Sequence, residues 1–427
     1  MTNESSESAG VLKETFQALN RFLFGYGTPV ALGVYRIFMA SLTLISLLIM
    51  SLNWDAFFSE KGYVPEWLGR IFISSRVPVG FGTPWSVPRI NVLSGVTDPR
   101  IGIAVYFVIC VSALFTALGL WTRVSSIILA IGLVSLQHRN AAILAGYDTV
   151  MRVNCMYLAM APCGAACSLD RLIGLWKGRA PAEPTQVSMW PQRLIAYNLA
   201  LLYLTTTWLK WGGGMWQDGT ATYYPARLAE FYRFPVPDWV NGFPLVTITT
   251  YGTLVTEFAL GTLVFFRPLR KTILILGILM HLHIELSMNV PLFSYLMIST
   301  YITFYDGEEV SAWAKRLGQR FVRFQATVWL PQGMQLTPAA AGFLRSVDPL
   351  SLVTYEKGEQ AGWSAATVKG PATNPSRVIF SRSIGSWLFG WFPGTWDKIL
   401  SKAIQPTPQE VEPVPTSHAK QTAKARR

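Results

Sequence analysis

Polar and ionisable side chains that interrupt apolar stretches are the residues of this sequence best suited to chemistry. They are Arg36, His138, Asn140, Lys210, Glu257, His281 and His283. Placing such a group in hydrocarbon costs about 3 kcal/mol or more, so it is rare and usually faces the interior of a helix bundle. We therefore look for the functional site among these positions.

Among these residues, Lys210 has the most distinctive neighbouring sequence. It ends an apolar segment and is followed by Gly212, Gly213 and Gly214, which allow close backbone approach, and then by a ring-rich loop that extends to Trp239. A cover of aromatic side chains would keep water from the amine and favour its neutral form, which can act as a base. An interfacial belt of aromatic residues is the simpler reading of the same loop.

Glu257 lies near the middle of its apolar segment, where a carboxylate must be protonated or paired. Arg36 or a histidine could be its partner, although Arg36 could equally extend to the membrane surface. His281 and His283 are two residues apart, so on a helix they point about 200° from each other and cannot both face one site. This spacing also does not suit a zinc pair on a helix, and we expect no metal site.

The composition predicts which elements hold these side chains. Apolar residues make up 51% of the 427 residues, charged residues only 14%, and mean hydropathy is +0.32, whereas a soluble domain carries about 25% charged residues. With four cysteines, a disulfide scaffold is excluded. The predicted fold is an all-α polytopic membrane bundle of about eight transmembrane helices, because about 20 apolar residues cross a bilayer. The predicted spans are Val30–Leu52, Ile101–Trp121, Ser125–Gln137, Thr149–Cys167, Leu194–Trp211, Pro244–Phe266, Thr272–Met288 and Val290–Tyr305.

Charge and composition divide the chain into four predicted regions. Residues 1–29 form a cytoplasmic N-terminal segment, 30–305 the bundle, 306–404 a C-terminal α+β region and 405–427 a disordered basic tail. Alternation predicts strands within 351–359, 362–370 and 376–383. The Lys/Arg bias of the short loops predicts a cell-membrane protein with both termini in the cytoplasm, and the net charge of +12 fits contact with anionic membrane lipids. No nucleic-acid-binding pattern is present, so no nucleic-acid partner is expected.

Four sequence motifs resemble the HTTM family, the membrane domain shared with the vitamin K-dependent gamma-carboxylase, in its bacterial form. They are FFSEKGYVPE (57–66), QHRNAAILAGYDTVMR (137–152), YLTTTWLKWGGGMWQDGTATYY (203–224), and the pair EFALGTLVFFRPLR (257–270) with HLHIELSMNVPLFSYLM (281–297). The second and third motifs are the more specific ones. Together the four cover residues 20–305, the whole predicted bundle.

The resemblance implies a carboxylase-like enzyme that uses a reduced quinone similar to vitamin K. In the carboxylase a lysine deprotonates the quinol, oxygen converts it to a strong base, and the glutamate carbanion that this base generates takes up CO₂. Residue by residue, Lys210 matches the lysine, His281 a family histidine and Glu257 an acidic residue, while the assisting histidine falls at His138 or Asn140. We therefore expect Lys210 to be the base and His281 and Glu257 to lie close to it as its polar support. The implied cofactor-binding residues around the aromatic loop are Trp216, Asp218, Gly219, Tyr223 and Tyr224.

Two other classes of function fit the same residues. One is a non-enzymatic protein that binds a lipid or peptide in the aromatic groove, or confers toxin immunity. The other is a proton-coupled transporter, in which Glu257 and the histidines relay protons, although no inverted repeat is visible. A peptide or a small lipophilic molecule is the expected substrate of an enzyme of this kind.

Overall fold

The computed structural model describes residues 2–72, 76–78, 86–88, 90–96, 98–235, 237, 242–321, 324–358, 362–367 and 404–406. The chain forms two compact units. The helical unit contains Met1–Gly174 and Glu183–Ala312, and the C-terminal unit contains Leu175–Ala182 and Trp313–Arg427. Each is described by itself.

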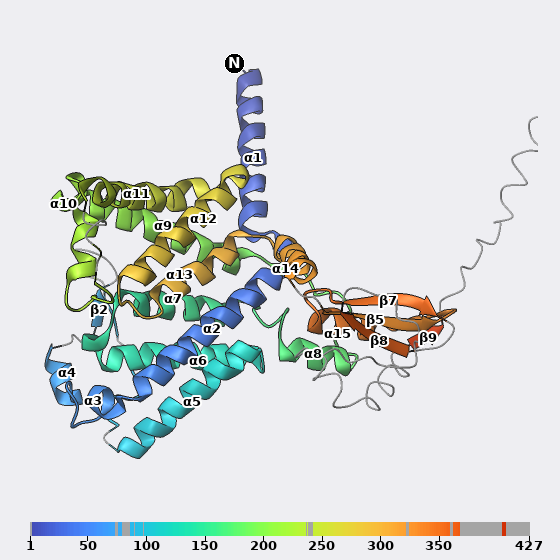
Figure 1. Ribbon diagram of the computed structural model, residues 1–427, viewed down its shortest axis with the longest axis horizontal. Helices are drawn as coiled ribbons and strands as arrows, with labels where there is room; N and C mark the ends of the chain where they lie inside the picture. The colour runs from blue at the N-terminus through green and yellow to red at the C-terminus, as the bar shows by residue number, and fades with distance from the viewer. Residues whose placement is uncertain are drawn as a thin grey trace, which may run out of the picture. The chain divides into compact units, whose positions relative to one another are not determined.

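The helical unit is built from long helices (Figure 1), with longer connections after α2 and after α9. The longer helices are α1 (Thr2–Phe24), α2 (Val30–Ser51), α5 (Pro99–Leu118), α6 (Thr122–Arg139), α7 (Gly146–Met160), α9 (Trp190–Trp211), α11 (Phe243–Thr262) and α12 (Arg267–Ser287). Shorter α-helices are α3 (Trp54–Phe58), α4 (Glu66–Phe72), α8 (Leu169–Trp176), α10 (Gly214–Gln217) and α13 (Phe293–Thr300). Single 3₁₀ turns are η1 (Ala141–Ile143), η2 (Ala221–Tyr223), η3 (Pro225–Arg227), η5 (Leu263–Phe265) and η6 (Tyr301–Phe304).

Two short antiparallel pairs complete this unit. β1 (Tyr26–Gly27) pairs with β4 (Val187–Ser188), and β2 (Arg76–Pro78) pairs with β3 (Ser86–Pro88). The first pair joins residues that are far apart in the sequence, since Tyr26 lies opposite Ser188.

Two apolar cores hold the long helices together. The first lies among α2, α5, α6 and α7, around Tyr35, Met39 and Leu133. The second lies among α9, α11, α12 and the chain from α13 to η6, around Leu199, Leu260 and Leu274. α9, α11 and α12 run side by side (Figure 1), and this second group of helices carries Lys210, Glu257 and His281.

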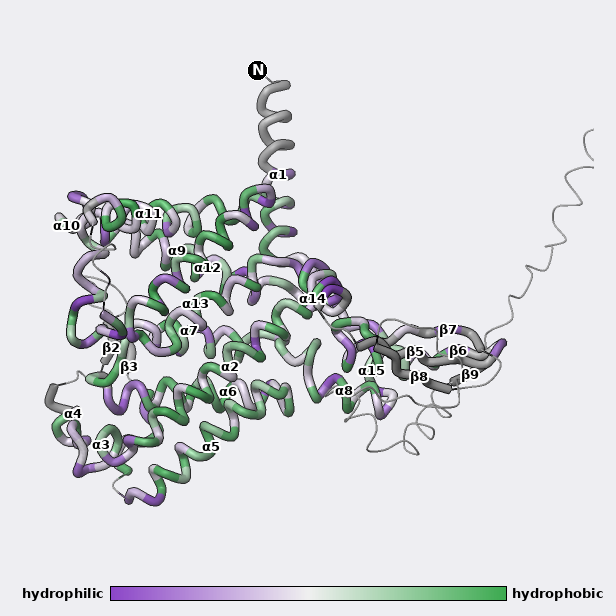
Figure 2. Tube along the Cα trace, viewed as in Figure 1, coloured by the Kyte–Doolittle hydropathy of each residue, from purple (hydrophilic) through white to green (hydrophobic). Residues whose placement is uncertain are grey.

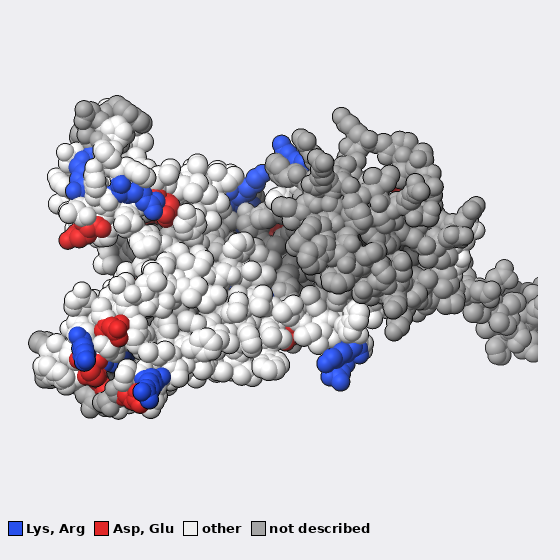
Figure 3. Space-filling model, turned by 60° about the horizontal axis from the view of Figure 1, so that its bottom comes forward, with Lys and Arg blue, Asp and Glu red and all other residues white. Residues whose placement is uncertain are grey.

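Apolar side chains also cover much of the outside of the helical unit. Ile101, Ile103 and Phe107 of α5 are each more than half exposed. The colours of hydrophobic residues run along α2 and α5 in Figure 2. In Figure 3 the coloured charged residues lie in a few groups, and the described surface between these groups carries few charges. A lipid-facing surface accounts for exposed apolar side chains on this scale.

Three of the described helices are long and apolar enough to cross a membrane. They are Val30–Ser51, Pro99–Leu118 and Pro244–Phe265, and Phe293–Phe304 is a shorter apolar helix. The predicted mostly helical membrane architecture is therefore present, while the count of eight spans remains a prediction. Each of the other predicted spans still contains a helix: α6, α7, α9 or α12.

Two predicted boundaries are wrong, and proline explains both. The fourth span was expected to continue to Cys167, but α7 ends at Met160, because Pro162 disfavours helical backbone at the preceding residue. The seventh span was expected to begin at Thr272, but α12 already begins at Arg267. Phe266 is extended there, and Pro268 occupies the first turn, where its missing N–H costs nothing.

The C-terminal unit mixes helices and strands. Its elements are the later part of α14 (Gly307–Phe321), β5 (Phe324–Pro331), β6 (Met334–Leu336), α15 (Pro338–Val347), β7 (Val353–Gly358), β8 (Gly362–Thr367) and β9 (Ile404–Pro406). The sheet order is β7-β5-β8: β5 and β7 are parallel with Ala326 opposite Val353, and β5 and β8 are antiparallel with Phe324 opposite Thr367. β6 and β9 pair separately, in antiparallel orientation.

The C-terminal predictions have mixed outcomes. Strands were expected within 351–359 and 362–370, where β7 and β8 lie. The strand expected at 376–383 lies outside the described residues, as does 407–427 of the predicted tail. Residues 405–406 belong to β9.

Candidate functional site

Lys210 forms an ion pair with Glu257, joining the end of α9 to α11. The other carboxylate oxygen of Glu257 accepts a hydrogen bond of 3.2 Å from the Thr206 hydroxyl, one turn before Lys210 on α9. The Glu257 side chain is 8% exposed and that of Lys210 is 26% exposed. The structure thus supplies the partner that a carboxylate in an apolar segment requires, and the partner is Lys210.

This pairing changes the expected state of Lys210. The sequence predicted a neutral amine kept from water by aromatic side chains, with Glu257 and His281 as its polar support. In the structure the carboxylate stabilises an ammonium, and the ring of Trp216, with its centroid 5.3 Å from Nζ, does the same. To act as a base, Lys210 must first give up a proton, and Glu257 is the acceptor in contact with it.

His281, on α12, lies in a second polar group that shares α9 with the first. It is 1% exposed, and its Nε2 is 2.8 Å from the hydroxyl of Tyr203 on α9. That hydroxyl is also 2.7 Å from the hydroxyl of Tyr301, at the start of η6. Tyr203, Thr206 and Lys210 follow one another at intervals of three and four residues, so both polar groups lie along one face of α9.

The two histidines of α12 have different environments. His281 is buried and His283 is exposed, which answers the question that their spacing left open. Gly277, His281 and Glu285 are buried at successive four-residue intervals, so they form the inward face of α12.

Tyr203 and Tyr301 are site residues that the sequence analysis missed. A signal was present for Tyr203, because it precedes Lys210 by seven residues and therefore shares its helix face. Tyr301 carries no comparable signal, since its contact with Tyr203 depends on how the chain after α13 packs against α9.

The loop after Lys210 is more open than predicted. Tyr223 and Tyr224 are 38% and 45% exposed, and the Arg227 guanidinium lies 3.9 Å from the centroid of the Tyr223 ring. Among the described residues this loop does not form a closed aromatic cover, and Trp216 is the predicted cofactor-binding residue that lies against Lys210. Trp239 lies outside the described residues.

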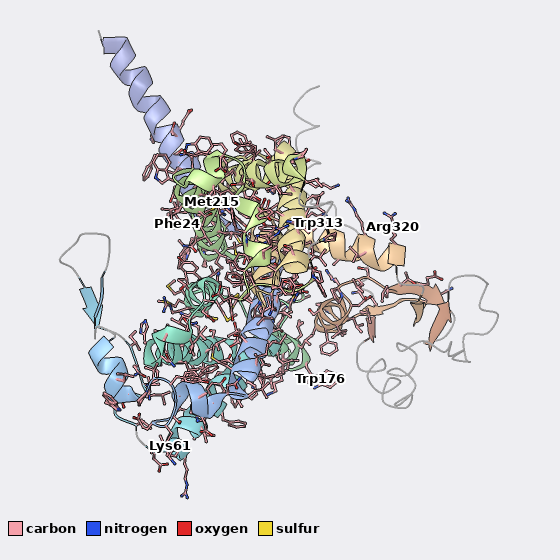
Figure 4. The ribbon with its side chains drawn as sticks, turned by 60° about the vertical axis from the view of Figure 1, so that its left-hand side comes forward. Phe24, Lys61, Trp176, Met215, Trp313 and Arg320 are labelled. Carbon is pink, nitrogen blue, oxygen red and sulfur yellow. The ribbon has the colours of Figure 1, made fainter. Side chains whose placement is uncertain are left out.

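Asp218 and Gly219 shape the turn after α10. The Asp218 carboxylate accepts hydrogen bonds from the backbone N–H and the hydroxyl of Thr220. Gly219 has φ of +79°, and a Cβ there would come within 3.2 Å of both Thr247 and Tyr251. These two residues therefore position the loop against α11. Met215, which lies in α10 just before this turn, is labelled in Figure 4.

The far end of the loop is attached to α12. Arg233 forms an ion pair with Glu285 at 3.2 Å and also donates to its backbone carbonyl. The N–H of Asn289 donates to the carbonyl of Phe231 at 2.7 Å. The loop is thus held at Lys210 and again one turn beyond His281.

His138 and Asn140 are placed at the end of α6, in a different cluster. The His138 Nδ1 is 3.0 Å from the carbonyl of Ile90, and the buried Asn140 amide donates to the carbonyl of Phe57 at 2.9 Å. Arg139 between them pairs with Glu60 at 3.0 Å. The structure thus brings the motifs at 57–66 and 137–152 together, and it does not bring His138 or Asn140 to Lys210.

A cavity of about 670 Å³ adjoins this cluster, lined by Trp54, Phe58, Glu60, Lys61, Asp98 and Arg139 among others. Lys61 extends away from the helices at this end (Figure 4). Lys210 and His281 are not among the residues lining the cavity.

Arg36 does not pair with Glu257. It is fully buried, and its guanidinium donates to the carbonyls of Cys163 at 3.1 Å, Cys167 at 2.6 Å and Ala117 at 3.5 Å. Ala117 lies in the last turn of α5, and Cys163 and Cys167 lie in the turns between α7 and α8, so Arg36 joins these segments to α2. Its role is structural.

Comparison with known proteins assigns the family. The family model described as HTTM domain matches residues 80–308, more than half of the chain. No curated protein and no solved structure matches this chain. The match includes Lys210, Glu257 and His281 together with the motifs at 137–152 and 203–224, and it begins after the motif at 57–66. With its apolar helices, the chain is a membrane protein that belongs to the HTTM family.

Proposed function

We propose that this protein is a membrane enzyme of the carboxylase-like type, which binds a reduced quinone and uses Lys210 as the base. The observation that carries the proposal is the Lys210–Glu257 pair, which shares one face of α9 with the buried Tyr203–His281 contact. Ionisable groups in direct contact inside a helix bundle are typical of sites for proton transfer.

The residues at the site suit an aromatic ring that carries oxygen atoms. Trp216 is half-buried and offers a ring face beside the amine. The buried His281 Nδ1 has no hydrogen-bond partner among the described residues, so a polar atom of a ligand could satisfy it. A reduced quinone, when bound, would supply acidic hydroxyl groups and reducing electrons.

The chain's own residues would carry out two proton transfers, whose net effect is to move one proton from the ligand to Glu257. Glu257 takes a proton from the Lys210 ammonium, which leaves a neutral pair in contact. The amine of Lys210 then takes the proton of a hydroxyl group held over Trp216. Thr206 keeps the carboxyl group of Glu257 oriented through its hydrogen bond.

We also propose the location of the protein and its substrate. The protein lies in the cell membrane with both termini in the cytoplasm, because the short loops that carry Arg123, Arg171, Lys177 and Lys271 would then face inward. Its acceptor substrate is a peptide or a small lipophilic molecule that reaches the site from the membrane, and membrane lipids surround the apolar helices.

Replacing Lys210 by Met tests the proposal in purified protein supplied with a reduced naphthoquinone. We expect quinol turnover to fall by at least about a hundredfold, as on removal of a general base, while the exposed control Lys177→Met retains turnover. Unchanged turnover in Lys210→Met would remove this residue from the mechanism.

Quinol binding without turnover in the wild-type protein would indicate a binding protein instead. Ion flux in proteoliposomes that disappears in Glu257→Gln would indicate a transporter.

A further inference from the structure

Tyr203, His281 and Tyr301 form a hydrogen-bonded chain inside the helical unit. All three are at most 4% exposed, and the Tyr203 hydroxyl lies between the His281 Nε2 and the Tyr301 hydroxyl. The remaining ring nitrogen, Nδ1, has no partner among the described residues. A buried polar atom in this state is unusual and calls for an explanation.

Counting hydrogens fixes the direction of this chain. A phenol has one hydrogen to donate, and so has a neutral imidazole. If Tyr301 donates to Tyr203 and Tyr203 donates to Nε2, the single unmet donor is an N–H on Nδ1. If Nε2 donates to Tyr203 and Tyr203 donates to Tyr301, both the Tyr301 hydrogen and the Nδ1 lone pair are unmet. The first arrangement leaves fewer buried groups without partners, so it is favoured.

The first arrangement gives His281 a buried N–H donor with no acceptor among the described residues. The donor belongs to a side chain fixed by Tyr203, and the face of α9 that carries Tyr203 also carries Lys210. A fixed donor next to a base can stabilise the oxygen from which the base takes a proton. The matching ligand group is therefore an oxygen that accepts a hydrogen bond.

We propose that the Nδ1–H of His281 donates a hydrogen bond to a ligand oxygen, and that Tyr301 and Tyr203 are positioning residues that hold His281 in this tautomer. The inference rests on the proposed function, because the ligand oxygen is the one deprotonated by Lys210. The tautomer itself can be measured in the protein without ligand.

Nitrogen NMR of ¹⁵N-histidine-labelled protein tests the tautomer first. The chain has four histidines, and the His281→Gln variant identifies the signal of residue 281. We expect Nδ1 protonated and Nε2 bare in the wild-type protein. Tyr301→Phe removes the terminal donor and should mix the tautomers, whereas Tyr295→Phe, at an exposed position of α13, should leave the signal unchanged.

Gly277→Ala provides a second, independent disturbance that keeps all three polar side chains. A Cβ at Gly277 would lie 2.5 Å from the Tyr301 hydroxyl, so it should displace that hydroxyl from Tyr203. We expect the tautomer mixture of Tyr301→Phe to reappear. A wild-type signal with Nε2 protonated would overturn the inference, whatever Lys210 does in turnover.

Binding of a reduced naphthoquinone tests the second part of the proposal, the hydrogen bond from His281 to a ligand oxygen. The amide nitrogen of Gln can reach the place of Nε2, and that of Asn the place of Nδ1. We therefore expect the dissociation constant to rise about tenfold to a hundredfold in His281→Gln, the loss expected for a hydrogen bond to a charged oxygen, and only a few-fold in His281→Asn. Equal losses in both variants would overturn the inference while leaving the proposed function in place. A wild-type Nδ1–H tautomer without any quinol binding would instead overturn the proposed function and, with it, the assignment of the ligand.

Discussion

At the scale of single residues, the central feature is an ion pair between Lys210 and Glu257, where a neutral amine was expected. Glu257 has partners for both carboxylate oxygens, Lys210 and Thr206. A carboxylate in a largely apolar bundle is stable only with such partners. The same contact that stabilises Glu257 also sets the starting state of Lys210, so structure and chemistry are coupled in this pair.

A double-mutant cycle measures that coupling. We expect Lys210→Met and Glu257→Gln each to lower the free energy of unfolding by about 1–3 kcal/mol, because each leaves the other partner unpaired. The double variant should lose less than the sum, by about 1 kcal/mol or more. Denaturant unfolding in detergent micelles provides the four values. Strict additivity would mean that the two charges do not stabilise each other.

Sequence reasoning identified some of these residues and missed others for a physical reason. Lys210, Glu257 and His281 stand out because ionisable groups are costly in apolar segments. Their pairing does not stand out, because it depends on the rotation of α9 against α11 and α12. Tyr203 and Tyr301 remained hidden among 16 tyrosines, since a tyrosine is common in such segments and carries no charge.

At the scale of helices, close approach depends on a few small residues. Gly132 of α6 faces Ile109 of α5, and a Cβ there would lie 2.5 Å from the Ile109 side chain. Gly261 of α11 is similarly close to Leu204 of α9. Small residues at such crossings let helices pack tightly within a membrane.

Substitution of two helical glycines by alanine should separate packing from helix propensity. Gly132→Ala is expected to destabilise the protein by about 1–3 kcal/mol, because Ile109 must move within a filled core. Gly252→Ala is the matched control, since a Cβ at Gly252 meets nothing within 4 Å, and alanine should stabilise α11 there by about 0.5–1 kcal/mol. Thermal unfolding midpoints in detergent compare the two. A Gly132→Ala variant as stable as Gly252→Ala would show that α5 and α6 are not packed as described.

At the scale of the whole molecule, the apolar segments correctly predicted where helices lie but often misplaced the residues at which the helices begin and end. Helix interiors follow from composition, whereas ends depend on local backbone chemistry, as Pro162 shows after α7 and Pro268 shows at α12. The relation between the motifs at 57–66 and 137–152 also needed the structure, because only the fold brings Glu60 to Arg139.

α12 presents the clearest question about how the helices cross the membrane. Its 21 residues span about 30 Å at 1.5 Å per residue, enough for the hydrocarbon core. It is not one of the three helices that are long and apolar enough to cross a membrane by composition. Its polar residues His281 and Glu285 are nevertheless buried while Leu279 and Leu286 are exposed, and His283 is its exposed histidine. This inward-polar, outward-apolar pattern suits a helix that lies in lipid and lines a site.

Cysteine labelling at the two ends of α12 tests whether it crosses. Lys271 and Asn289 are both exposed and bracket the helix, so Lys271→Cys and Asn289→Cys should react from opposite sides of the membrane. With an impermeant maleimide on intact cells, we expect labelling of Asn289→Cys at once and of Lys271→Cys only after permeabilisation, because the basic end should face the cytoplasm. The wild-type chain, whose four cysteines are buried or partly buried, provides the background. Equal labelling of both variants from outside would place both ends of α12 on one side, and the eight-span arrangement would then be wrong.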